Sequence, residues 1–156
     1  MARQVLTYNS SLDNYRRAGI LTAFTAGAAI TAGNMVYLDG NGEILPAADP
    51  MLLFGRGGIS GVAESTVASG EKVVVWQSGV FEYVTDVAQA IKAGQYLYVA
   101  SNAISVDLGG GRANEISCGM AESATAGTAS GEIVEVLITP TRKRSPYLYD
   151  SDSPYL

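Results

Sequence analysis

The chain contains no histidine and only one cysteine, Cys118. These two scarcities exclude an internal disulfide, a metal cage of histidine and cysteine, and the histidine-dependent nucleophile systems of hydrolases. Cys118 lies in the apolar segment 115–120, where a lone cysteine usually behaves as a small buried hydrophobic residue. We therefore expect no metal ion, no cofactor and no catalytic histidine chemistry.

Charged residues make up only 16% of the chain, and long runs of leucine, glutamate and lysine are missing. Helices favour such runs, whereas the short clusters of valine, isoleucine, threonine and tyrosine between glycines are typical of strands and turns. The composition therefore predicts an all-β protein. The net charge of −5 would repel phosphates, so we expect no nucleic-acid partner.

Arg16 and Arg17 precede an apolar stretch that looks like a secretory leader. The stretch ends in Ile-Thr-Ala-Gly at 30–33, and almost the same residues, Ile-Lys-Ala-Gly, return at 91–94 in the middle of the chain. A leader has no reason to recur there. We expect this stretch to be part of the fold, and we expect no membrane partner.

The recurrence extends over most of the chain. "AITAGNMVYLDGNGEI" is echoed by "AIKAGQYLYVASNAIS", "ISGVAES" by "ISCGMAES", and "ASGEKVVV" by "ASGEIVEV", in the same order and about sixty residues apart. Such collinear matches indicate an internal duplication. The predicted segments are an N-terminal arm at 1–17, a first β repeat at 18–79, a second β repeat at 80–140, and a C-terminal arm rich in tyrosine and proline at 141–156.

Each repeat is expected to be a small β unit resembling a barrel or half of a sandwich. The Ala-Gly and Ser-Gly pairs are predicted turns, because glycine tolerates the positive φ that tight turns require. The β-branched runs at 71–76 and 132–138 are predicted core strands. We also expect single helical turns at 49–54 and 86–91. Two arrangements remain open: two separate lobes, or one interleaved barrel.

Two acidic pairs recur with the repeat, Glu64 with Glu122 and Glu71 with Glu132. Paired carboxylates are the machinery of glycoside hydrolases. However, these residues recur together with their turns and strand ends, and no neighbouring base or electrophile accompanies them. We interpret them as structural residues and expect no enzymatic activity.

The two arms differ from the body in composition. Residues 18–140 carry four basic and twelve acidic residues, whereas the arms carry six basic and three acidic ones. Five of the nine tyrosines lie in the arms, and tyrosine and arginine are enriched at interface hot spots. The predicted partner-binding residues are Tyr8, Tyr15, Arg16, Arg17, Arg142, Lys143, Arg144, Pro146, Tyr147, Leu148, Tyr149, Pro154, Tyr155 and Leu156.

The repeated patterns resemble the capsid cement or head decoration proteins of tailed bacteriophages. The resemblance rests on the Ile-x-Ala-Gly turn at 30–33 with the Val-Tyr strand after it, on Gly-Val-Ala at 61–63, and on Ser-Gly-Glu at 69–71. It covers about residues 20 to 139. The Tyr-rich and Arg-containing arms go beyond a minimal member of that family.

The resemblance implies a structural role without catalysis. It implies a β-rich body on the outer surface of the icosahedral head, commonly a homotrimer, that clamps neighbouring major capsid subunits. The expected partners are therefore the major capsid protein and further copies of the chain. The alternative is a virion surface adhesion or carbohydrate-binding module, in which exposed tyrosines and Trp76 would stack on sugars; its position after Val73-Val74-Val75 favours burial of Trp76 instead.

Overall fold

The computed structural model describes residues 15–17, 21–47, 59–100, 103–109, 116–138 and 143–144. Within these ranges the regular elements are all strands, so the predicted all-β class is confirmed. The strands of the N-terminal part are β1 (Tyr15–Arg17), β2 (Leu21–Ala26), β3 (Met35–Leu38), β4 (Glu43–Pro46), β5 (Gly61–Ala63) and β6 (Lys72–Trp76). Those that follow are β7 (Gly79–Thr85), β8 (Tyr96–Val99), β9 (Ser105–Asp107), β10 (Ile116–Ser117), β11 (Gly119–Ala121), β12 (Ile133–Ile138) and β13 (Lys143–Arg144).

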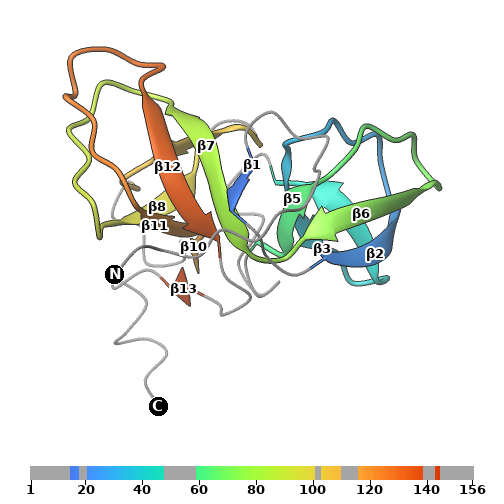
Figure 1. Cartoon of the computed structure of the whole chain (residues 1–156). Coiled ribbons are helices and arrows are strands. Elements are labelled where there is room, and N and C mark those ends of the chain that lie inside the picture. Colours follow the sequence, from blue (N-terminus) through green and yellow to red (C-terminus); the bar gives the residue numbers. More distant parts are fainter. Residues whose placement is uncertain are drawn as a thin grey trace, which may run out of the picture.

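Ten of the described strands form two closed rings, while β1 is added to β7, and β10 and β13 form a separate two-stranded sheet. The first ring is a barrel in the order β2-β4-β3-β5-β6, with β6 pairing back to β2. The second ring has the order β7-β9-β8-β11-β12, and it closes because β12 pairs with β7. In each ring a single parallel pair, β2 with β4 or β7 with β9, is combined with antiparallel pairs. Figure 1 shows the two rings next to each other, the second on the left and the first on the right.

The strand pairing settles the arrangement that the sequence left open. The described strands of 21–76 pair with one another, as do β7, β8, β9, β11 and β12, so the halves form separate rings and not one interleaved barrel. The repeated order of pairing agrees with an internal duplication. The duplication itself, and the segment boundaries expected from it, stay predictions.

The predicted turns occupy equivalent places in the two rings. Gly33 and Gly94 have φ angles of 89° and 94°, a left-handed region that favours glycine. The next side chain closes each turn: Asn34 Oδ1 accepts a hydrogen bond from the Thr31 amide at 3.0 Å, and Gln95 Oε1 accepts one from the Lys92 amide at 2.7 Å. The Ala-Gly turns that recur in the sequence therefore have the same backbone conformation and the same closing hydrogen bond in both rings.

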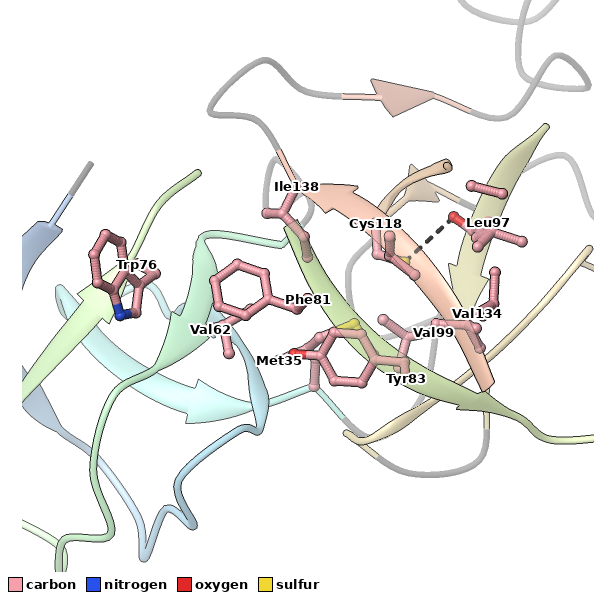
Figure 2. Packing of buried hydrophobic residues seen from close by; sticks show 14 of the residues in the cluster. Met35, Val62, Trp76, Phe81, Tyr83, Leu97, Val99, Cys118, Val134 and Ile138 are labelled. Carbon is pink, nitrogen blue, oxygen red and sulfur yellow. Dashed lines mark hydrogen bonds between the residues drawn. The ribbon is translucent and has the colours of Figure 1, made fainter. Parts of the chain in front are cut away.

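Two apolar clusters lie within the part of the chain that the structure describes. One lies inside the first ring and includes Ile30, Ile44 and Val73. The larger one fills the second ring and extends into the first, because Met35, Val62 and Trp76 belong to it. Figure 2 shows Val62 and Met35 facing Phe81 and Tyr83 of the second ring.

Polar bonds also join the rings. The Tyr83 hydroxyl donates to the Gly33 carbonyl at 2.9 Å in a buried setting, and the Met35 amide donates to the Ala103 carbonyl at 2.8 Å. The contact between the rings therefore combines apolar packing with hydrogen bonds whose partners are fixed by the turns and strand ends.

One expectation about local structure is wrong. Residues 86–91 form no helical turn, because their polar groups bond to other segments. The Asp86 amide donates to the Val106 carbonyl at 3.0 Å, and the Thr125 hydroxyl donates to the Gln89 carbonyl at 2.7 Å. These long-range bonds replace the local ones of a helix. The other expected helical turn, at 49–54, lies outside the described residues.

Candidate docking surfaces

The structure describes only part of the two arms that the sequence singled out. Tyr15, Arg16 and Arg17 form β1, whose backbone pairs with β7 at Val80 and Phe81. Lys143 and Arg144 form β13, which pairs with β10. The other predicted partner-binding residues, Tyr8, Arg142, Pro146, Tyr147, Leu148, Tyr149, Pro154, Tyr155 and Leu156, lie outside the described residues.

Both arms are thus tied by backbone pairing to strands that follow residue 78. In Figure 1, β1 lies beside β7, and β13 lies below β10. Short strands at the root of each arm fix where the arm leaves the body. That the arm side chains bind a partner remains a prediction.

The recurring glutamates Glu71 and Glu132 hold turns. Glu71 Oε2 accepts a hydrogen bond from the Ala68 amide at 2.9 Å. Glu132 accepts bonds from the amides of Gly127 and Thr128, each at 3.0 Å, and the Gly127 amide is the main reason that the pKa of Glu132 lies below its usual value. The structural interpretation of these two carboxylates is confirmed.

Trp76 is buried, as its sequence position indicated. Its side chain is 1% exposed, and its indole Nε1 donates to the Glu64 carboxylate. A ring in that position cannot stack on a sugar at the surface. The carbohydrate-binding alternative required Trp76 to be exposed, and the burial of this residue argues against it.

Cys118 is also buried, as predicted. Its thiol donates a long hydrogen bond of 3.4 Å to the Leu97 carbonyl. Burial raises the pKa of the thiol to about 12. A thiol that stays protonated is a packing group and not a nucleophile.

Neither a membrane-crossing helix nor a metal cluster is found in the part of the chain that the structure describes. None of its elements is a helix long and apolar enough to span a bilayer. No three of its cysteine, aspartate or glutamate side chains gather as metal ligands would.

The structure also reveals a surface that the sequence analysis missed, on the outer face of the second ring. Tyr96, Met120 and Leu137 lie directly opposite one another on the neighbouring strands β8, β11 and β12. Directly opposite residues share one face of a sheet, so the three form a continuous row. Tyr96 is 46% exposed, and Met120 and Leu137 are half-buried.

We call these three residues the outer row. In the sequence, the strands β8 and β11 are too short to show a period of two, so outward and inward positions could not be told apart. The echo of the first repeat offered the only available signal, since it aligns the outer row with Met35, Val62 and Trp76.

Comparison with known proteins agrees with the resemblance seen in the sequence. Residues 47–138 match the family described as phage cement protein. The solved structures to which the chain is similar include the N base of the head fiber gp8.5 of bacteriophage phi29, with a TM-score of 0.48 and 17% sequence identity over 81% of this chain and 98% of that one. No curated protein matches the sequence. The chain belongs to the phage cement protein family, structural proteins of the virion that are located at the surface of the phage head.

Proposed function

We propose that the chain docks on the outside of the icosahedral head, across the boundaries between neighbouring major capsid subunits, and clamps them together without catalysis. The observation that carries this proposal is the family match over residues 47–138. The described body is compatible with it, since closed rings with buried cores form a rigid unit.

Linkage explains how such binding stabilises a shell. A protein that binds the assembled lattice, and not separated subunits, shifts the equilibrium toward the lattice. The excess of acidic residues in the body suits the outside of a head, because a protein on the inside would face packaged DNA.

In this proposal the arms reach neighbouring subunits. Arg142, Lys143 and Arg144 pair with acidic surface, and the two Ser-Pro-Tyr-Leu units at 145–148 and 153–156 fill apolar grooves. A single unit of four residues binds weakly, but several copies on one oligomer gain affinity through their effective concentration. The expected oligomer is a homotrimer, as the resemblance implies.

The test uses heads prepared without this chain, from a phage whose gene for it is deleted. Purified chain is added, its occupancy on the heads is measured by sedimentation and electron cryomicroscopy, and the temperature at which the heads rupture is recorded. We expect saturable binding across subunit boundaries and a higher rupture temperature. Heads that neither bind the chain nor gain heat resistance would refute the proposal.

Deletion of 145–156 tests the arm separately and keeps β13 in place. We expect a folded body with lower occupancy on heads. Light scattering on the full-length and shortened chains shows in addition whether the same residues hold copies together. Unchanged occupancy and unchanged mass after the deletion would leave the arm without a role in binding.

A further inference from the structure

Two strands cross the junction between the rings in one register. Within the first ring, β2 pairs with β6 so that Leu21 lies opposite Trp76. On the other side of the junction, β1 pairs with β7 so that Arg17 lies opposite Val80. Each of the two chain segments between these pairs has three residues. The same antiparallel register therefore holds on both sides of the junction.

The strand β1 belongs to both rings. Along the chain it leads into β2 of the first ring, whereas its backbone pairs with β7 of the second ring, and Figure 1 shows it beside β7. Between β6 and β7 the chain has only Gln77 and Ser78. The Thr22 hydroxyl donates to Gln77 Oε1 at 2.6 Å and ties this linker to β2. The junction is thus crossed by two strands and not by a single linker.

The other hydrogen bonds between the rings lie on a different side of the first ring. The Gly33 carbonyl accepts from the Tyr83 hydroxyl, and the Met35 amide donates to the Ala103 carbonyl at 2.8 Å. Met35 is the first residue of β3, and in the ring order β4 and β5 separate β3 from β2 and β6. The second ring is therefore attached at two sides of the first ring.

Attachment at two sides fixes an orientation that apolar packing leaves free. Burial of apolar surface holds the rings together, but it is non-directional and allows one ring to turn against the other. Bonds at one side alone leave rotation about that side. Paired strands fix a register, so the pairing of β1 with β7 removes this rotation.

We propose that β1 is a strap that locks the two rings in one orientation. Residues 18–20 allow β1 to lie at most about 14 Å from Leu21. If the second ring turns or moves away beyond this reach, the pairing of β1 with β7 breaks. The pairing therefore favours the closed junction over an open one. This inference concerns the body itself, goes beyond the proposed function and does not rest on it.

The test measures amide hydrogen exchange in the full chain, because an amide exchanges when its hydrogen bond opens. The Met35 amide reports the junction, since its acceptor lies in the other ring and β1 does not pair with β3. Two amides report the rings themselves. The Ala26 amide donates to the Glu71 carbonyl in the first ring, and the Cys118 amide donates to the Leu97 carbonyl in the second, each at 2.9 Å.

Three variants separate the strap from other roles of β1. Neighbouring N–H groups of a strand point in opposite directions, so one of those of Arg16 and Arg17 faces β7, and the double variant Arg16→Pro/Arg17→Pro removes it. Arg16→Ala/Arg17→Ala removes the same side chains and keeps both N–H groups. The third variant inserts Gly-Ser-Gly-Ser between Gly19 and Ile20, which keeps β1 but makes its connection to β2 slack. If thermal unfolding shows that the double proline variant is not folded, the two single proline variants replace it.

We expect the Met35 amide to exchange at least about fivefold faster in the proline variant and in the insertion variant, as the loss of one hydrogen bond to the closed junction implies. Exchange at Ala26 and Cys118 should change less than about twofold, because each ring keeps its own pairing. The alanine variant should exchange like the original chain.

Four outcomes would overturn the inference. Unchanged exchange at Met35 in a folded proline variant would mean that β1 does not hold the junction. Equal acceleration at Met35, Ala26 and Cys118 would mean that β1 stabilises the whole fold and not the orientation of the rings. Acceleration in the proline variant without acceleration in the insertion variant would mean that β1 only completes the sheet of the second ring. An equal effect in the alanine variant would assign the role to side chains and not to strand pairing.

Discussion

Single glycines set how closely neighbouring strands of each ring approach. A Cβ added at Gly119 would lie 2.4 Å from the Leu137 carbonyl oxygen, and one at Gly61, the equivalent place in the first ring, 2.1 Å from that of Trp76. Backbone atoms at such distances must move apart. A residue with any side chain would therefore open the pairing of β11 with β12 or of β5 with β6.

We expect Gly119→Ala to lower the free energy of unfolding by about 2–4 kcal/mol, because a backbone clash in the core has no flexible side chain to relieve it. Gly70→Ala is the control. It introduces strain at a φ of 87° but has nothing within 4 Å of the added Cβ, so a loss of about 1 kcal/mol is expected. Urea unfolding of both variants measures the difference; equal losses would contradict the steric explanation.

The buried thiol of Cys118 makes the free energy of unfolding depend on pH in the alkaline range. Burial raises its pKa from the ordinary value of 9.0 to about 12. Between these values the unfolded chain releases the thiol proton while the folded chain keeps it, so stability is fully present below about pH 9 and falls as the pH rises toward 12. Above the folded pKa the loss is complete.

We expect the urea midpoint of unfolding to fall between pH 9 and pH 12, and to fall less in Cys118→Ala, which has no thiol to ionise. The native thiol should also react much more slowly than the unfolded thiol with a thiol reagent at neutral pH. The same midpoint difference between the original chain and Cys118→Ala at every pH would show that the thiol is not the titrating group.

At the scale of elements, the turn that precedes β12 depends on a charged side chain. Glu132 accepts from the amides of Gly127 and Thr128 and from the Thr128 hydroxyl, which lowers the pKa of the carboxyl. A group whose folded pKa is lowered adds stability above its unfolded pKa, and this stability disappears as the pH falls through the folded value.

We therefore expect Glu132→Gln to be less stable than the original chain at neutral pH, with the difference vanishing in acid. Glu135→Gln serves as a control outside the turn, on an outward position of β12. Thermal unfolding at several pH values follows the difference. A gap between Glu132→Gln and the original chain that persists in acid would indicate lost packing in place of lost charge.

Much of the fold could be predicted at this scale, because its signals are local. The turns at Gly33 and Gly94 need a residue that tolerates positive φ, and the β-branched runs in 72–76 and 133–138 identify core strands. The segment 86–91 was mispredicted because its backbone bonds to Val106 and Thr125, far away in the chain. The outer row was missed because the register of the strands brings Tyr96, Met120 and Leu137 together. No local sequence pattern specifies that register.

At the scale of the whole molecule, the two rings share one core. Met35, Val62 and Trp76 of the first ring lie in the same cluster as Phe81 and Val136 of the second. Removing one ring would expose this cluster to water, at a cost of about 25 cal/mol per Å² of apolar surface. The rings should therefore not unfold independently.

The chain offers one probe in each ring, Trp76 in the first and Cys118 in the second, and both are buried. We expect the fluorescence of Trp76 and the reactivity of Cys118 to change at the same urea concentration, as two-state unfolding requires. Tyr83→Phe removes the donor to the Gly33 carbonyl between the rings. It should lower the free energy of unfolding by about 1–2 kcal/mol. The two probes should then share one lower midpoint.

Tyr96→Phe is the matched control, because it removes a hydroxyl from a half-exposed tyrosine of the same ring and should leave the midpoint unchanged. Separate midpoints for Trp76 and Cys118 in the original chain would mean that the shared cluster does not couple the rings. The proposed clamp would depend on this coupling, because β1 and β13 of the arms are paired to strands beyond residue 78. Force on those strands reaches the first ring through the shared core and through the hydrogen bonds that join the two rings.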